Sequence, residues 1–184
     1  IGFSNSELPN APMVVQVARE VKRLYPGVKL LAGGQAPSFR PELFLGPAGP
    51  FDAVALYEAE GTVVSLAEAL LSGAPLDGLQ GCAWRAADGA LTRSSVERVV
   101  CDLDKGPMPY WEGSLKESSF SKGYFAALET SRGCPFRCTF CSIPGYYGAP
   151  RYKSARRILE ELRALKAMGV TEFSINDDSF ATRP

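Results

Sequence analysis

Histidine is absent from the 184 residues of this chain. Without an imidazole, these residues can form no Ser-His-Asp triad, no histidine-bound zinc site and no imidazole general base. Net charge is absent as well, because 20 lysines and arginines balance 20 aspartates and glutamates, so no basic field favours a nucleic-acid partner. Long apolar runs are also missing. With no stretch of the roughly 18–20 residues that cross a bilayer and no signal-peptide pattern, we expect no membrane span.

The remaining composition is that of a chain that forms a core, 46% hydrophobic and 22% charged. The chain begins without Met, in the apolar run Ile1-Gly2-Phe3-Ser4, and it stops at Pro184, just after a strand-like segment. We therefore expect an internal fragment of a longer protein, cut inside one domain at the front and inside another at the back.

Residues 1–73 alternate strand and helix signals. Asn10 is the expected N-cap of a helix over 11–24, whose apolar residues follow the 3.6-residue period. A second long helix is predicted over 62–71, and one short helical turn over 41–45. The expected strands cover residues 1–4, 28–32 and 53–57. Mostly apolar strands that alternate with helices predict an α/β fold, in which helices cover both faces of a parallel sheet.

Residues 74–123 have a different character. A small hairpin is predicted around Asp88-Gly89, because this pair supplies the positive φ that tight turns need. The segment 101–123 is rich in Pro, Ser and charge without periodicity, which indicates an interdomain linker. Residues 124–184 then begin a second α/β unit. Its expected elements are a strand over 124–129, a helix from the N-cap Ser154 to Met168, and a strand over 170–175.

Three of the five cysteines lie within eight residues, in the spacing C-x3-C-x2-C of Cys134, Cys138 and Cys141. Thiolates this close must converge on one small object. Iron–sulfur clusters are normally held by four cysteine thiolates, so three would leave one iron open to a substrate. The loop follows the carboxyl end of a predicted strand, where parallel α/β folds build their active sites. Phe136 and Phe140 in this loop could shield a cluster from water.

The cysteine spacing alone leaves two further possibilities open. Cys82 or Cys101 could complete a closed structural zinc site, although zinc loops generally combine two short cysteine pairs and both spare cysteines precede the linker. The three cysteines of the motif could also be simple buried thiols. Three cysteines within eight residues, beside Arg132 and Arg137, are however a poor fit to inert core packing. Cys82 and Cys101 are most simply reduced thiols, which favours a reducing compartment and a cytoplasmic location.

At these residues the sequence resembles the radical S-adenosylmethionine (SAM) enzymes, whose signature is a C-x3-C-x-aromatic-C loop after the first strand of a partial (β/α) barrel. The resemblance implies that Cys134, Cys138 and Cys141 ligate a [4Fe–4S] cluster and that SAM chelates its fourth iron. It also implies that an external one-electron reductant leads to cleavage of SAM and a 5′-deoxyadenosyl radical. Further SAM contacts are implied at the aromatic position before the last cysteine and at the end of the second strand, namely Phe140, Asn176, Asp177 and Asp178. The two aspartates could equally be a solvated turn or a helix N-cap.

The front of the chain resembles the subgroup in which a cobalamin (B12) domain precedes that barrel. Gly2 to Ser6 occupies the place of a serine-containing strand end, and Gly33-Gly34 matches a later glycine pair. The resemblance implies cobalamin contacts at Ser4, Ser6, Gly33 and Gly34. Ordinary turn glycines and serines that satisfy backbone groups are the alternative, in a degenerate domain that binds nothing.

Together these features predict three regions. Residues 1–73 are the C-terminal part of a Rossmann-like B12-binding domain, 74–123 are a hairpin and linker, and 124–184 are the first βαβ unit of a truncated radical SAM domain. The implied function is methyl transfer from methylcobalamin to an unactivated carbon of a small-molecule or peptide substrate. The alternatives are cyclisation or rearrangement without methylation, an iron–sulfur electron carrier, and a structural zinc module.

Overall fold

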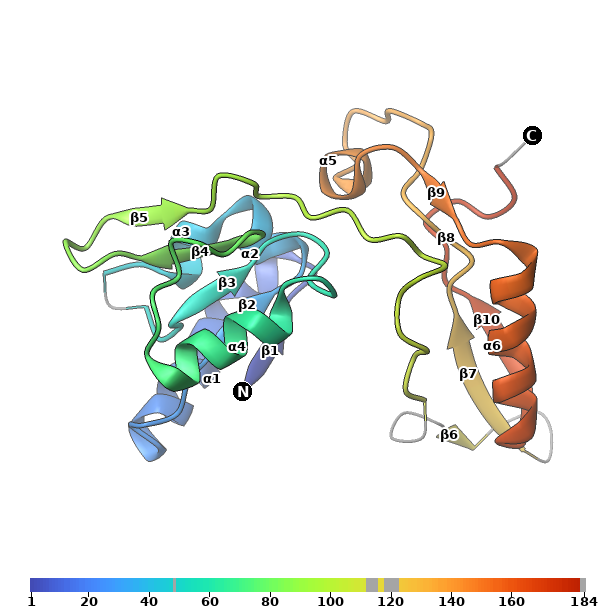
Figure 1. Cartoon of the computed structure of the whole chain (residues 1–184), viewed down its shortest axis with the longest axis horizontal. Helices are drawn as coiled ribbons and strands as arrows, with labels where there is room; N and C mark the ends of the chain where they lie inside the picture. The colour runs from blue at the N-terminus through green and yellow to red at the C-terminus, as the bar shows by residue number, and fades with distance from the viewer. Residues whose placement is uncertain (48, 112–115, 118–122, 183–184) are drawn as a thin grey trace. The chain divides into compact units, whose positions relative to one another are not determined.

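The chain forms two compact units, Ile1–Cys101 and Asp102–Pro184. The structure is a computed structural model that describes residues 1–47, 49–111, 116–117 and 123–182 (Figure 1). Both units combine α-helices with a sheet that contains parallel strands. No helix among these residues has the length and apolarity that crossing a membrane requires.

The first unit is built on a five-stranded sheet in the order β1-β2-β3-β4-β5. The first three strands are parallel to one another, and the last two join antiparallel. The strands are β1 (Gly2–Ser4), β2 (Leu31–Gly33), β3 (Ala53–Ala55), β4 (Cys82–Arg85) and β5 (Leu91–Arg93). The helices are the 3-10 helix η1 (Leu8–Asn10), α1 (Ala11–Leu24), α2 (Gln35–Phe39), α3 (Pro41–Phe44) and α4 (Val63–Ser72).

Helices cover both faces of this sheet, as the alternating pattern predicts. Successive residues of β3 point to opposite faces. Val54 lies in one core cluster with Ala18 of α1, while Ala53 and Ala55 lie in a second cluster with Leu66 of α4. Burial of a side chain as large as Val54 or Leu66 stabilises the fold by about 1.5–3 kcal/mol. The predicted hairpin is confirmed as β4 and β5.

Two local expectations in this unit are wrong, and one helix was not predicted. Asn10 does not cap α1, because its side chain donates to Glu7 Oε2 at 3.3 Å and its backbone is already helical, in the 3-10 turn η1. The second strand begins at Leu31 rather than at residue 28, because the Leu30 amide donates to the Asp52 carboxylate instead of a neighbouring strand. Helix α2 was not expected, since it is short and contains Pro37.

The second unit holds a three-stranded sheet in the order β10-β7-β6, with β7 and β10 parallel. Strands β8 and β9 form a separate antiparallel pair. The elements are β6 (Lys116–Glu117), β7 (Tyr124–Leu128), β8 (Ser131–Arg132), α5 (Ile143–Tyr147), β9 (Arg151–Tyr152), α6 (Ala155–Ala167) and β10 (Val170–Ile175). Helix α6 runs along the sheet, where Leu165 packs with Ala126 and Leu128 of β7 (Figure 1).

Helix α6 begins where the sequence predicts. The Ser154 hydroxyl accepts from the Arg157 amide at 3.1 Å, which confirms this serine as the N-cap. One turn further on, Glu161 is fully buried and accepts from Lys153 Nζ at 2.9 and 2.8 Å and from Arg157 Nε at 2.9 Å. Arg157 also donates to the Pro107 carbonyl at 2.8 Å. This buried ion network joins α6 to the chain that precedes it.

Part of the segment expected to be a linker also packs in the second unit. Trp111 is buried with Ala126 and Leu128, and its indole nitrogen donates to the Ala127 carbonyl at 3.3 Å. Residues 112–115 and 118–122 of the same segment lie outside the described residues. The boundaries at 73/74 and 123/124 stay predictions.

Candidate metal centre

The cysteine loop connects two short strands that pair with each other, so its two ends lie side by side. Strand β8 leads into it and β9 leads out, with Ser131 opposite Tyr152 and Arg132 opposite Arg151. The Lys153 amide adds a hydrogen bond to the Thr130 carbonyl at 2.9 Å. Because both ends of the loop are held side by side, residues 133–150 can form a compact site despite their low content of regular structure.

Gly133 is required at the first position of the loop. Its φ is +85°, a conformation that L side chains rarely adopt. A Cβ here would also stand 3.3 Å from Pro150 Cα and from Tyr147 Cβ, on the returning side of the loop. The glycine therefore permits both the sharp turn into Cys134 and the close approach of the two sides.

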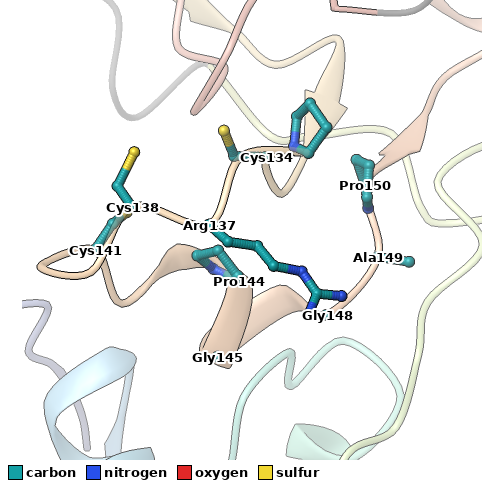
Figure 2. A pocket seen from close by; sticks show the side chains of 10 residues that line it. Cys134, Arg137, Cys138, Cys141, Pro144, Gly145, Gly148, Ala149 and Pro150 are labelled. Carbon is teal, nitrogen blue, oxygen red and sulfur yellow. The ribbon is translucent and has the colours of Figure 1, made fainter.

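All three cysteines of the motif line one pocket of about 650 Å³. Its other walls come from Pro135, Arg137 and the returning segment between residues 144 and 150 (Figure 2). This volume lies in the range of about 300–1,000 Å³ that small-molecule and cofactor sites occupy. Figure 2 shows the thiols of Cys134 and Cys138 on the same side of the loop, with the Arg137 side chain extended toward Gly148. The cysteine motif ends at Cys141, so this returning segment lies outside it.

The donor set consists of three cysteine thiols on one loop, with no fourth cysteine among the described residues that line the pocket. Within the described part of the chain, no three His, Cys, Asp or Glu side chains converge closely enough to hold one ion. Structural zinc draws all its thiolates to about 2.3 Å from one centre. A four-iron cluster instead offers each thiolate its own iron, so its ligands stand farther apart. Three cysteine thiols that line one pocket are donors that such a cluster can use.

The remaining two cysteines belong to the first unit and have no part in this pocket. Cys82 is fully buried in the core of that unit, where burial raises the pKa of its thiol. For Cys101, burial and then the neighbouring carboxylates of Glu60 and Glu58 raise the thiol pKa. In both residues the raised pKa favours the protonated thiol, which is the less reactive form. All five cysteines are free of disulfide bonds.

The aromatic side chains of the loop do not cover the cysteines. Phe136 is 60% exposed and Phe140 is 91% exposed, and neither lines the pocket. The expected shielding from water is therefore not a property of this structure, because both rings are exposed to solvent. A contact between Phe140 and a bound ligand stays a prediction.

The acidic end of β10 lies at the base of the cysteine loop. The Asn176 amide donates to the Leu128 carbonyl at 2.8 Å, so β7 and β10 end together. Asp177 Oδ1 accepts from the backbone amides of Thr130 and Ser131 at 2.6 and 3.1 Å. Its Oδ2 accepts from the two hydroxyls of the same residues, at 2.7 Å from Ser131 Oγ. Asp178 Oδ2 accepts from the Gly133 amide at 2.9 Å.

These contacts explain the ionisation of Asp177. Burial opposes the charged form, but the hydrogen bonds from Thr130 and then Ser131 outweigh it and lower the pKa of this carboxyl. Sequence reasoning found both aspartates but missed Thr130 and Ser131, which are 47 and 46 residues away from Asp177 along the chain. The only signal was two hydroxyl residues placed directly before Arg132-Gly133-Cys134.

The predicted residues of the first unit also meet at one edge of its sheet. Ser4 stands opposite Gly33 in the β1–β2 pair, and the Asn5 amide donates to the Gly33 carbonyl at 2.9 Å. Ser4, Asn5 and Ser6 line a pocket of about 330 Å³. Gly34 has φ +98°, and a Cβ there would stand 2.6 Å from the Asn5 carbonyl oxygen. The packing of the two chain segments therefore accounts for Gly34.

Asn5 shows a feature that protein packing does not account for. The residue is only 5% exposed, and its side-chain Nδ2 has no hydrogen-bond partner among the described residues. A buried amide without a partner costs about 1–3 kcal/mol. A polar group supplied by a ligand would remove that cost.

Comparison with known proteins agrees with the site. The sequence model of the radical SAM superfamily matches residues 128–183, the region that contains the three cysteines, α6 and β10. An uncharacterized methyltransferase of Pyrococcus horikoshii is 32% identical over 167 residues, covering 89% of this chain and 36% of that protein. The hopanoid C-3 methylase of Methylococcus capsulatus is 32% identical, covering 97% of this chain and 34% of that protein.

A solved structure shares the folds of both units. The cobalamin-dependent S-adenosylmethionine radical enzyme OxsB matches with a TM-score of 0.74 and 25% identity, over 98% of this chain and 25% of that one. The chain spans about a third of the length of the two curated relatives. OxsB is cobalamin-dependent, and the chain itself belongs to the radical SAM superfamily, whose model matches residues 128–183 and whose cofactors are a [4Fe–4S] cluster and S-adenosylmethionine.

Proposed function

We propose that Cys134, Cys138 and Cys141 hold a [4Fe–4S] cluster whose open iron binds SAM, and that the whole protein is a cobalamin-dependent methyltransferase acting on carbon. One observation carries the first part: three thiols line a single pocket that also has room for a small molecule. When bound, the cluster supplies one electron to the sulfonium of SAM, and cobalamin supplies a methyl group. The residues of this chain bind and orient these groups.

The residues that we propose for contact with SAM lie at two places in the second unit, the end of β10 and the cysteine loop. At the carboxyl end of β10, Asn176 and Asp178 are our candidates for contact with the amino group of SAM, and Phe140 is our candidate for contact with its adenine. The exposure of Phe140 fits such a role, because a ring left in water can be covered by a bound ligand. Asp177 is not among these candidates, since its carboxylate is already engaged within the protein.

Two features of the first unit support a cobalamin site there. Ser4, Ser6, Gly33 and Gly34 meet at the carboxyl edge of parallel strands, where open α/β sheets bind ligands. The buried amide of Asn5 at the same edge needs a polar partner. We accordingly propose residues 1–73 as the C-terminal part of a Rossmann-like B12-binding domain.

The βαβ order of β7, α6 and β10 supports the matching proposal for the second unit. We propose residues 74–123 as hairpin and linker and 124–184 as the start of a partial (β/α) barrel. The two relatives that share 32% identity are named as a methyltransferase and a methylase, which supports methyl transfer over the cyclisation for which relatives of 26% and 28% identity are named. The proposal further assigns a small-molecule or peptide substrate, an external one-electron reductant and a cytoplasmic location.

The test uses the full-length protein purified without oxygen. Iron, sulfide and zinc are measured first, and then SAM and a strong reductant are added and 5′-deoxyadenosine is quantified. We expect iron and sulfide in near-equal amounts and formation of 5′-deoxyadenosine. Cys141→Ala should lose both, while Cys101→Ala, which changes a thiol outside the pocket, should retain both. Zinc in place of iron, or iron without 5′-deoxyadenosine, would contradict the proposal.

Methyl transfer needs a second measurement on the same preparation. SAM carrying an isotopically labelled methyl group is supplied together with cobalamin, and the label is followed onto cobalamin by mass spectrometry. Labelled methylcobalamin supports the methyltransferase proposal. Cleavage of SAM with no labelled cobalamin would leave the cluster assignment standing and overturn the methyl-transfer part.

A further inference from the structure

The carboxylate of Asp177 is fully engaged by the start of the cysteine loop. An ionised carboxylate offers about four acceptor positions. Asp177 uses them for four hydrogen bonds, two from backbone amides and two from hydroxyls of Thr130 and Ser131. To contact an ammonium group of a ligand, this carboxylate would have to release at least one of these bonds.

The engaged bonds connect the sheet to the first cysteine. Asp177 follows β10, which pairs in parallel with β7 along its length. Thr130 and Ser131 follow β7 and precede Cys134 by four and three residues. The Asp177 contacts therefore link the segment after β10 to the segment after β7 at the carboxyl ends of the two strands. The cysteine loop starts directly after this link.

A neighbouring contact continues the same support. The Asp178 carboxylate accepts from the amide of Gly133, the residue directly before Cys134. On the far side, the loop returns through β9 to Lys153, which is held by the buried Glu161. The start of the loop thus depends on β10, and its end depends on α6.

We propose that Asp177 is a positioning residue that fixes the start of the cysteine loop for cluster binding, rather than a residue that binds SAM. This inference rests on the proposed function of the three cysteines. Residues that orient metal ligands from behind change metal affinity by about 10–100-fold when they are removed. Asp177 acts on Cys134 through the backbone, because it holds Thr130 and Ser131, four and three residues before the cysteine.

Two substitutions separate positioning from direct binding of SAM. Asp177→Asn keeps a carbonyl oxygen for the two backbone amides, and its NH2 can donate to the Thr130 and Ser131 hydroxyls, which can rotate to accept. Asp177→Ala removes all four bonds. A positioning role therefore tolerates Asn and not Ala, whereas a charge contact with the SAM ammonium group is lost equally in both variants.

The matched control is Asp52→Ala in the first unit. Asp52 also accepts from a backbone amide, that of Leu30 at 2.8 Å, and from a charged donor, Lys22 Nζ at 2.7 Å. It has no part in the cysteine pocket. Any general loss of stability on removing a partly buried aspartate should appear in this variant as well.

The experiment measures three quantities in full-length, anaerobically prepared protein: hydrogen exchange of residues 129–134 without the cluster, iron retained against a chelator, and the dissociation constant of SAM with the cluster. We expect Asp177→Ala to accelerate exchange at the loop start and to weaken iron retention by about 10–100-fold. We expect Asp177→Asn to retain iron and SAM affinity close to wild type, and Asp52→Ala to leave the loop start unchanged.

Two results would overturn the inference. One is an Asp177→Ala protein with wild-type exchange and iron retention. The other is an Asp177→Asn protein that keeps its cluster but loses SAM affinity as severely as Ala does. Either result leaves the wild-type cluster in place and so spares the proposed function. A wild-type protein that binds no iron–sulfur cluster would instead overturn the proposed function.

Discussion

Glu161 accepts hydrogen bonds from two buried cations, so we expect its substitution to destabilise α6 strongly. Its side chain is 0% exposed, and those of its partners Lys153 and Arg157 are 7% and 10% exposed. Replacing Glu161 by Gln leaves two buried cations with one neutral acceptor between them. Removing one partner of a buried ion network costs about 3–5 kcal/mol, because the remaining charges stay buried without compensation.

The matched control is the preceding residue of the same helix. Glu160 pairs with Arg156 at 3.2 Å, but these side chains are 38% and 76% exposed. An exposed pair of this kind contributes about 0–1 kcal/mol because water screens it. Glu160→Gln should therefore change the stability of α6 very little.

The assay is native-state hydrogen exchange of the α6 amides in the full-length protein, which reports local opening without assuming that the whole chain unfolds at once. Since about 1.4 kcal/mol is tenfold, 3–5 kcal/mol predicts exchange faster by roughly 100-fold to several thousandfold in Glu161→Gln. Exchange in Glu161→Gln within a few-fold of that in Glu160→Gln would refute the reasoning that the buried network stabilises α6.

Three further outcomes are expected. Ser154→Ala removes the N-cap bond of α6 and should lower its local stability by about 1 kcal/mol, measured by the same exchange. Gly133→Ala should accelerate local hydrogen exchange more than Gly89→Ala does and should also impair iron binding. Both glycines have positive φ, but only at Gly133 would a Cβ stand against neighbouring atoms. Equal changes in local exchange in the two variants would argue against steric crowding. The lowered pKa of Asp177 predicts that protection of the loop start is complete above its ordinary pKa and is lost as pH falls through the folded value. Exchange at residues 129–134, corrected for the intrinsic effect of pH, should therefore rise in acid in the wild type and vary less in Asp177→Asn.

Long periodic elements were readable from the sequence. The bounds of α1 and β10 agree with the predicted 11–24 and 170–175, and α6 lies between its predicted cap and its predicted last residue. The helices α1 and α6 each have an apolar face with a regular period that packs into a core cluster, whereas Phe173 and Ile175 of β10 stay exposed. In the two helices the periodic signal and the packing therefore point to the same answer.

Features that depend on contacts between distant residues were not readable. Helix α2 has five residues and contains a proline, and the backbone bond from Ala36 to the Asn5 carbonyl places it, so no local pattern announces it. The role of Asp177 depends in the same way on a partner 46 residues earlier. The cysteine motif predicted the place of the site because its spacing is local, but not the residues that support the loop.

The proposed chemistry depends on a four-iron cluster in which the three cysteines ligate three irons and the fourth iron is open to SAM. Mössbauer spectroscopy of the ⁵⁷Fe-loaded full-length protein, recorded with and without SAM, is the decisive test. We predict a [4Fe–4S] spectrum in which one iron of the four changes its isomer shift on addition of SAM while the other three do not. Isomer shifts of all four irons that stay unchanged on addition of SAM would contradict this assignment, as would a protein that takes up zinc and no iron.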